Sequence, residues 1–277
     1  MSLKSLISKI LAHNPVSRIV FSLTGKRISF NHLTIRTIAF VLKQRIPFHH
    51  VIIDVADNMV TPLTKSLLYY GIYEQKEVDF IKKYLNENDD VIELGSSIGV
   101  TGSIISYIQT NGRYISVEAD PSLIDANKKN IQLNRKTDYV LINKAIDYFS
   151  KTVSFSASKS TLTGQLNRSG SDDSTITVET ITLNEICETY EFNNFTLICD
   201  IEGAEVTILL NDKNALEKCE KIIIELHDTE YNGKKYLIPD IVDLIIANNF
   251  KFLDQNKSVF AFQKNTFAAK KKKSFPE

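Results

Sequence analysis

Residues 91–121 read VIELGSSIGVTGSIISYIQTNGRYISVEADP, and this stretch decides the fold. It begins with the apolar β pattern of residues 91–94, and a turn with glycine at both ends, residues 95–99, follows. Residues 100–109 have helical spacing, and residues 114–118 again have a β pattern. A strand, a glycine turn, a helix and a second strand in this order predict one unit of a parallel sheet.

Short β patterns and helical patterns continue to alternate as far as residue 262, which is typical of a parallel sheet covered by helices on both faces. We therefore predict an α/β, doubly wound, Rossmann-like fold with a seven-stranded, mostly parallel sheet. The last two strands are close in sequence and should form an antiparallel hairpin at one edge. The predicted strands are 91–94, 114–118, 139–142, 196–199, 222–226, 251–253 and 258–262, and the predicted helices are 100–109, 122–133, 183–190, 206–210 and 238–247.

Two carboxylates frame the glycine turn and indicate which ligand it holds. Gly95 and Gly99 allow the backbone to approach a bound molecule, as in dinucleotide-binding turns. Glu93 ends the first strand, where it would repel a pyrophosphate but attract the ammonium and sulfonium groups of S-adenosylmethionine. Glu118 ends the next strand 25 residues later, where a carboxylate can accept both ribose hydroxyl protons. The pair predicts S-adenosylmethionine as the cofactor and disfavours NAD.

Neighbouring residues are expected to complete the cofactor site. Ser96 and Ser97 lie inside the glycine turn, and Ala119 follows Glu118 directly. Asn143 follows the third strand, where the adenine edge is usually contacted, so we predict that it contacts adenine.

Acidic side chains and a histidine follow the next two strands at their carboxyl ends, where ligands bind in an open α/β sheet. Methyl transfer requires an aligned acceptor that loses its proton. His227 has an unperturbed pKa near ~6.5 and can accept that proton, while Asp200 is the competing base or orients the histidine. A cation such as Mg²⁺ is an alternative role for the cluster, but the spacing is no metal signature and we predict no metal ligand. The predicted catalytic residues are Asp200, Glu202, Glu225 and His227.

The hexapeptide Asp-Ile-Glu-Gly-Ala-Glu at residues 200–205 resembles the Asp-Val-Glu-Gly-Ala-Glu hallmark of FkbM-type methyltransferases. The resemblance extends over residues 67–263. In the glycine turn the family has Asp-x-Gly-Ala-Asn, whereas this chain has Glu93 and two serines, which keep the charge and the polarity. Further matching segments are Gly-Ile-Tyr-Glu at 71–74, Val-Glu-Ala-Asp-Pro at 117–121, Thr-Ile-Thr-Leu-Asn-Glu at 180–185 and Glu-Leu-His at 225–227.

This resemblance implies a class I methyltransferase fold and an O-methyltransferase that acts on a hydroxyl of a glycan or glycan precursor. It also adds Glu74 and Asp200 to the expected cofactor contacts. The alternatives are an N- or C-methyltransferase acting on a small molecule, lipid or protein, and a catalytically inactive cofactor-binding scaffold. They stay open because the residues predicted to bind the cofactor do not identify the acceptor.

Three segments lie outside the regular alternation, and they suggest how the chain is divided. Residues 152–155 and 175–181 predict an inserted β-hairpin around a polar loop, 158–173, which is either a lid or a plain hairpin tip. We expect a basic, mainly helical N-terminal extension over 1–66, a cofactor-binding domain over 67–265 and a lysine-rich tail over 266–277.

Charge is distributed unevenly along the chain. Residues 1–53 contain eight Lys or Arg and no Asp or Glu, although the whole chain has a net charge of zero. This arm, with helical patterns over 3–11 and 31–46, either packs on the acidic body or makes peripheral contact with an anionic membrane surface. The acidic body, and the lack of an Asn-Pro-Pro-aromatic motif after the fourth strand, disfavour nucleic acid as a substrate.

The remaining composition indicates a cytoplasmic protein, peripheral to the inner face of a membrane if the arm binds lipid. No apolar run reaches the roughly 18 residues of a membrane span. The three cysteines are odd in number and have no metal-ligand spacing, so we expect reduced core thiols. The sequence leaves the oligomeric state open.

Overall fold

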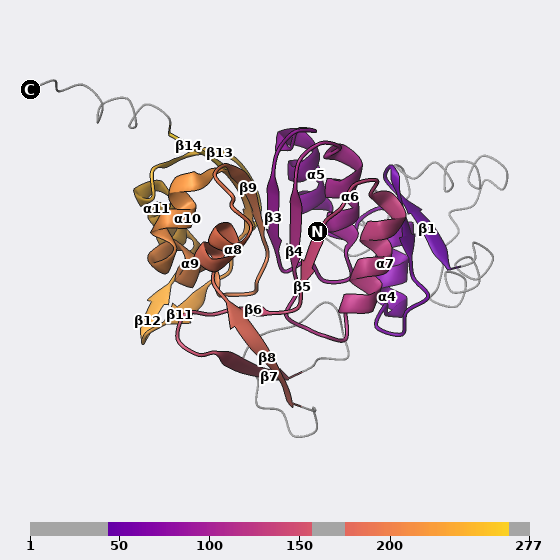
Figure 1. The fold of residues 1–277 in the computed structure, drawn as a ribbon, viewed down its shortest axis with the longest axis horizontal. Helices are drawn as coiled ribbons and strands as arrows, with labels where there is room; N and C mark the ends of the chain where they lie inside the picture. Colours follow the sequence, from indigo (N-terminus) through magenta and orange to yellow (C-terminus); the bar gives the residue numbers. More distant parts are fainter. Residues whose placement is uncertain (1–43, 157–174, 266–277) are drawn as a thin grey trace, which may run out of the picture.

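A seven-stranded sheet forms the centre of the protein, whose computed structural model describes residues 44–156 and 175–265 (Figure 1). The strand order is β13-β14-β10-β9-β3-β4-β5, and every strand is parallel to the others except β14, which is antiparallel to both neighbours. The doubly wound prediction with a terminal antiparallel hairpin is therefore confirmed. The strands are β3 (Val91–Leu94), β4 (Tyr114–Val117), β5 (Val140–Ile142), β9 (Phe195–Cys199), β10 (Cys219–Glu225), β13 (Phe250–Asn256) and β14 (Val259–Lys264).

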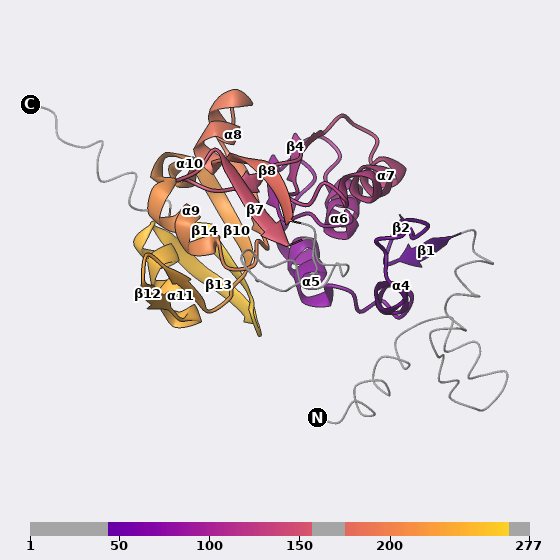
Figure 2. The ribbon, with the colours of Figure 1, turned by 90° about the horizontal axis from the view of Figure 1, so that it is seen from below.

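Helices cover both faces of this sheet, as Figure 2 shows from below. Alternate residues of β3 divide between two hydrophobic cores: Val91 packs with α5, α6 and α7, whereas Ile92 and Leu94 pack with the helices of the other face. The period of two along the strand is what a sheet buried on both faces requires. The helices are α4 (Pro62–Tyr69), α5 (Gln75–Tyr84), α6 (Val100–Ile108), α7 (Ile124–Asn134), α8 (Leu183–Thr189), α9 (Glu205–Asn211), α10 (Lys213–Lys218) and α11 (Ile238–Ala247).

A β-hairpin precedes α4 and packs against α6 and α7. Its strands are β1 (Arg45–Phe48) and β2 (Val51–Asp54), and their apolar side chains belong to the core on that face. The helical pattern over 31–46 is wrong at its end, because Arg45 and Ile46 are in β1. Pro47 accounts for this, since a residue before proline disfavours the helical conformation. Residues 1–43, with the rest of the basic arm, lie outside the described residues.

Two small sheets lie below the central sheet in the view of Figure 1. The predicted inserted hairpin is confirmed as β7 (Thr152–Ser156) and β8 (Thr175–Ile181), with β6 (Ala145–Ile146) added in parallel to β8. The loop at 158–173 lies outside the described residues. A second hairpin, β11 (Thr229–Tyr231) and β12 (Lys234–Tyr236), was not predicted. The rings of Phe149 and Tyr231, 6.0 Å apart, join the two insertions.

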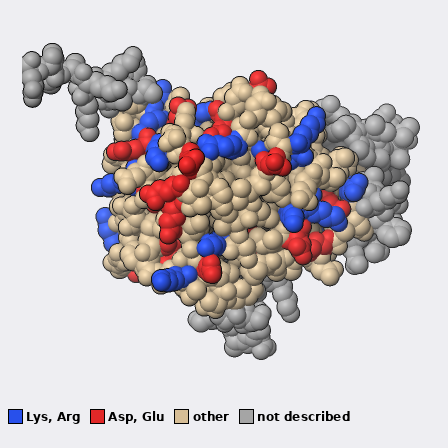
Figure 3. Space-filling view, viewed as in Figure 1, with Lys and Arg blue, Asp and Glu red and all other residues tan. Residues whose placement is uncertain are grey.

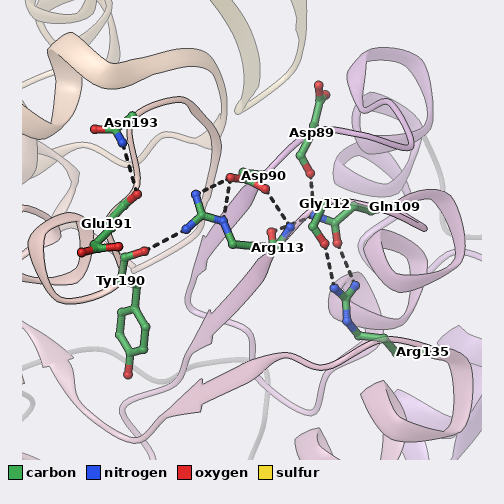
Figure 4. Close-up of polar contacts among 9 residues, drawn as sticks. All are labelled: Asp89, Asp90, Gln109, Gly112, Arg113, Arg135, Tyr190, Glu191 and Asn193. Atoms are coloured by element: carbon green, nitrogen blue, oxygen red, sulfur yellow. Dashed lines mark hydrogen bonds and ion pairs between the residues drawn. The ribbon is translucent and has the colours of Figure 1, made fainter.

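Side chains fasten the amino ends of the central strands, which form the opposite edge of the sheet (Figure 4). Arg113 precedes β4 and donates to Asp90 Oδ2 through Nε at 2.9 Å and Nη2 at 2.6 Å. Its Nη1 donates to the Tyr190 carbonyl at 2.9 Å, which ties in the end of α8. Arg135 donates to Gln109 Oε1 at 2.7 Å. These structural contacts occupy the amino ends of the strands, and the acidic site residues lie at the carboxyl ends.

Acidic and basic side chains are interspersed on the face drawn in Figure 3, with a run of acidic ones on the side of α8 and α10. The three cysteines, Cys187, Cys199 and Cys219, are free and buried, as expected of core thiols. Among the described residues no helix has both the length and the apolar character needed to cross a bilayer.

Candidate functional site

The glycine turn after β3 packs directly on the end of β9. Gly95 has a φ of 85°, and a Cβ added there would lie 1.8 Å from the Asp200 carbonyl oxygen. Gly99 has a φ of 79°, and a Cβ there would lie 2.8 Å from the Asn127 carbonyl oxygen. The close approach that requires these glycines is therefore made by the chain itself. It places Asp200 beside the turn expected to hold the cofactor.

The two serines of the turn have different surroundings. Ser96 is 1% exposed, accepts a hydrogen bond from Ser116 Oγ at 2.7 Å and from Asn127 Nδ2 at 2.8 Å, and so faces the interior. Ser97 adopts a φ of 47°, and its buried Oγ has no hydrogen-bond partner. The cofactor role of both serines stays a prediction, and for Ser96 only the backbone is placed to fulfil it.

Glu118 lies at the carboxyl end of β4, linked to the turn. Its Oε2 accepts the Ser97 N–H at 2.6 Å and its Oε1 accepts the Asp120 N–H at 2.8 Å. Asn143 Nδ2, after β5, donates to the carbonyls of Glu118 at 2.9 Å and Ala119 at 3.0 Å. Burial raises the pKa of Glu118 to about 7. Each carboxylate oxygen keeps a second lone pair that can accept a ribose hydroxyl.

Glu93 is buried beneath the turn. It is 1% exposed, and Tyr114 Oη donates a hydrogen bond to its Oε2, while its Oε1 has no hydrogen-bond partner. Burial raises the pKa of Glu93 to about 7. The residue that indicated the cofactor from sequence therefore lies under the turn, and its contact with the cofactor stays a prediction.

Two glutamates at the start of α5 join the same acidic cluster. Glu74 has a φ of 45°, and burial, followed by repulsion from Asp200, raises its pKa to about 8. Glu77 is 5% exposed, and burial and the Glu74 charge raise its pKa. Glu77 was not predicted as a site residue. Its helical spacing from Phe80 and Ile81 places it with them on the buried face of an amphipathic helix, which is unusual for a glutamate. An acid on such a face has a structural or functional partner more often than not.

Asp200 and His227 form the centre of the acceptor side. Burial and the Glu225 charge raise the pKa of Asp200 to about 7, and its Oδ1 has no hydrogen-bond partner. His227 Nδ1 lies 3.0 Å from Glu205 Oε1, and Nε2 lies 3.6 Å from Glu202 Oε2. The bond to Glu205 raises the pKa of His227 to about 9, against the opposing effect of burial.

This pKa bears on the choice of base. A value of about 9 favours the imidazolium form of His227 at neutral pH, so its role as the proton acceptor stays a prediction. Asp200, with a pKa of about 7, is the better-matched base. Glu205 was missed as a site residue, although it ends the quoted hexapeptide.

Glu225 lies at the end of β10 and is held from two sides. Ser258 Oγ donates to Glu225 Oε1 at 2.5 Å, and Lys76 Nζ lies 3.6 Å from the same oxygen. Its charge acts on Glu74 and on Asp200. The structure thus brings the predicted acids from β3, β9, β10 and the start of α5 into one electrostatic cluster.

The chemistry of this cluster fits a cationic, hydrogen-bonding ligand. Acids whose pKa values are raised by burial and mutual repulsion are stabilised as carboxylates by a positive charge. S-adenosylmethionine carries a sulfonium and an ammonium, and its ribose diol matches the acceptor oxygens of Glu118. Within the part of the chain that the structure describes, the buried atoms near the turn without hydrogen-bond partners include Glu93 Oε1, Ser97 Oγ, Asn127 Oδ1 and Asp200 Oδ1.

Known proteins resemble this chain in sequence and in fold. Residues 93–252 match the methyltransferase FkbM domain. Hexuronic acid methyltransferase AglP of Haloferax volcanii is 28% identical over 155 residues, which cover 54% of this chain and 62% of the relative. This chain therefore matches less than two thirds of that relative's length.

Similar solved structures include a Pyrococcus furiosus methyltransferase, at 13% identity and a TM-score of 0.41, with 94% of this chain and 98% of that chain covered. Aeropyrum pernix fibrillarin in complex with S-adenosyl-L-methionine is 12% identical, with a TM-score of 0.41 and coverage of 68% of this chain and 73% of that chain.

Proposed function

The protein belongs to the FkbM methyltransferase family, and from this premise we propose that it transfers a methyl group from S-adenosylmethionine to a hydroxyl of a glycan or glycan precursor. The observation that carries the proposal is the contact between the glycine turn and Asp200, because only glycine at position 95 allows it. This contact places the residues expected to bind the cofactor next to the residues expected to bind the acceptor.

S-adenosylmethionine supplies an electrophilic methyl group on a sulfonium, whose carbon–sulfur bond breaks as the bond to the acceptor oxygen forms. Glu118 would accept the ribose hydroxyls while two backbone N–H groups hold its carboxylate in place. Glu93 and Glu74 provide negative charge that favours the cationic methyl donor over its neutral thioether product.

Asp200 would take the proton that the acceptor hydroxyl loses. Its pKa of about 7 places it among general bases that work at neutral pH. His227, as an imidazolium held by Glu205, is placed to donate a hydrogen bond through Nε2 toward Glu202 or an acceptor oxygen. Both residues lie at the carboxyl edge of the sheet, so the acceptor approaches from that edge.

A sugar acceptor is supported by the relative in Haloferax volcanii, whose name specifies hexuronic acid as its substrate class. Aromatic rings also lie beside the acceptor edge. Phe149 is 64% exposed and its ring packs at 6.0 Å from Tyr231, four residues after His227. Exposed aromatic faces of this kind suit the apolar faces of sugar rings.

Transfer of a labelled methyl group from S-adenosylmethionine tests the proposal. The purified full-length chain is incubated with glycans, uronic acids, lipids, peptides and small metabolites, and the labelled product is identified by mass spectrometry. Label on a sugar oxygen supports the proposal. Label on nitrogen, on carbon or on a non-sugar acceptor would contradict the proposal and favour a methyltransferase with another acceptor. Binding of S-adenosylmethionine without transfer to any acceptor would favour a cofactor-binding scaffold.

A further inference from the structure

Three side chains on the acceptor side are arranged as ligands of a metal ion. Asp200, Glu202 and His227 each offer one ligand atom, and these atoms all lie within 4.8 Å of one another. Asp200 directly follows β9, Glu202 lies in the same turn, and His227 follows β10, so the ends of two neighbouring strands supply the set. Two carboxylate oxygens and an imidazole nitrogen suit Mn²⁺ and related divalent cations.

Glu205 is an independent observation that points to a ligand there. Its side chain is completely buried, its Oε1 lies 3.0 Å from His227 Nδ1, and its Oε2 has no hydrogen-bond partner. A histidine that binds a metal usually donates its other ring N–H to a carboxylate, which fixes the tautomer and the ring orientation. With Nδ1 directed at Glu205, Nε2 is the nitrogen directed toward Glu202.

Asp200 has a buried carboxylate oxygen, Oδ1, that has no hydrogen-bond partner among residues 44–156 and 175–265. A buried charged oxygen that accepts nothing is unfavourable, and a cation bound beside it removes that cost. The negative charges of Glu225 and Glu202 act on the same carboxylate, so the surroundings also favour a cation electrostatically.

We propose that Asp200, Glu202 and His227 Nε2 bind a divalent cation, which takes the place of the proton on Nε2 of the unliganded ring, with Glu205 as the residue that orients His227. The ion would take one oxygen from each carboxylate and leave other coordination positions for two neighbouring oxygens of the acceptor. This inference rests on the proposed function for its role, although the binding itself does not. An acidic sugar would otherwise be repelled by Asp200, Glu202 and Glu225, and the cation offsets that repulsion.

The cation also assists loss of the acceptor proton. It lowers the pKa of a hydroxyl whose oxygen it holds, so the Asp200 oxygen that does not bind the ion can accept the proton. The hydroxyl O–H bond and the methyl–sulfur bond of S-adenosylmethionine would both break as the oxygen–methyl bond forms. The proton would pass to Asp200 and the electron pair would stay on sulfur as a thioether.

Binding of Mn²⁺ to the full-length chain tests the proposal without any turnover. The protein is first freed of metal with EDTA and then titrated with Mn²⁺, without cofactor or acceptor, while electron paramagnetic resonance records the free ion. We expect saturable binding that Glu202→Gln and His227→Gln each weaken at least about tenfold, and that Glu205→Gln weakens by about tenfold through the ring orientation. Glu230→Gln, an exposed carboxylate on β11, is the matched control and should bind like the original chain.

Circular dichroism and S-adenosylmethionine titration in EDTA show whether each variant remains folded. No binding of Mn²⁺ by the original chain would overturn the proposal, as would equal affinity in all four variants. If methyl transfer proceeds in EDTA while Mn²⁺ is not bound, the cation is refuted and the proposed function survives. If Mn²⁺ binds as expected but no methyl group is transferred to any acceptor, the cation site survives and the proposed function fails.

Discussion

Glu205 Oε1 lies 3.0 Å from His227 Nδ1, and the Glu205 side chain has no exposed surface. Glu205 begins α9, so the fold itself holds the carboxylate behind the imidazole ring. A fixed negative partner stabilises the protonated ring and fixes its direction. This arrangement favours a protonated His227 in the unliganded protein, and we propose Asp200 as the base.

Replacing Glu205 with glutamine should lower the pKa of His227 by more than one unit, because the bond to Glu205 is the largest cause of its elevation. Nuclear magnetic resonance titration of the five histidine imidazoles in EDTA measures this, with a His227→Gln sample for assignment. Glu230→Gln serves as the control. An unchanged His227 titration in Glu205→Gln would mean that the pair does not form in solution.

Gly95→Ala should unfold the protein or destabilise it by more than about 3 kcal/mol, because the added carbon meets the Asp200 carbonyl at 1.8 Å. Gly71→Ala is the matched control: it has a φ of 69° but no atom within 4 Å of the added carbon, so it should cost only about 1 kcal/mol. Urea unfolding gives both values. Equal losses in the two variants would show that the turn does not contact β9 closely.

The free energy of unfolding should fall as the pH rises from about 5 to about 9. The folded-state pKa values of Glu74, Glu93, Glu118 and Asp200 lie at about 7 or 8, above their unfolded values near 4. The folded protein therefore binds more protons in this window, and these protons are lost as the pH rises through the folded pKa values.

His227 has the same effect. Because its pKa is raised to about 9 in the folded protein, its contribution to the free energy of unfolding is complete below pH 6.5 and is lost above pH 9. We expect a loss of at least about 2 kcal/mol over the window, and a smaller loss with saturating S-adenosylmethionine, whose positive charge favours the carboxylates. Urea unfolding at several pH values measures it. Stability that stays constant or rises with pH contradicts the buried acidic cluster.

If Asp200 is the base, the rate of methyl transfer should rise with pH through about 7, with the slope of a single proton, as that carboxyl ionises. Asp200→Asn should lose this rise and lower kcat at least about 10²-fold. Asp243→Asn, an exposed position on α11, should keep both the rate and the profile. An unaltered pH profile in Asp200→Asn would exclude Asp200 as the base.

The central sheet could be predicted from sequence because each of its strands is a short apolar run between turns. The strand at 91–94 has the predicted bounds, whereas β10 and β13 extend beyond the predicted 222–226 and 251–253. Their extra residues include the charged Lys221 and Asp254. Pairing with β14, and not an apolar pattern, holds these two residues in the sheet. Strand ends are decided by partners that are distant in sequence.

The hairpin β11–β12 was missed although Asn232-Gly233 is a strong local signal for one. Both residues have left-handed φ values, 51° and 72°, as the tight turn requires. The flanking residues are too polar for a recognisable strand pattern. The site shows the same limit: sequence order placed the acids at strand ends, but only the fold reveals that Glu205 supports His227 and that Ser96 faces the interior.

Calorimetric titration with S-adenosylmethionine tests the central claim most directly, that the turn after β3 and the end of β4 hold this cofactor. We expect binding by the full-length chain and a loss of about 10²-fold in Glu118→Ala, since hydrogen bonds to a carboxylate contribute about 1.5–3 kcal/mol each. Glu188→Ala, an exposed carboxylate on α8, should bind normally. Folded Glu118→Ala protein with undiminished affinity, or no binding by the original chain, would contradict the account.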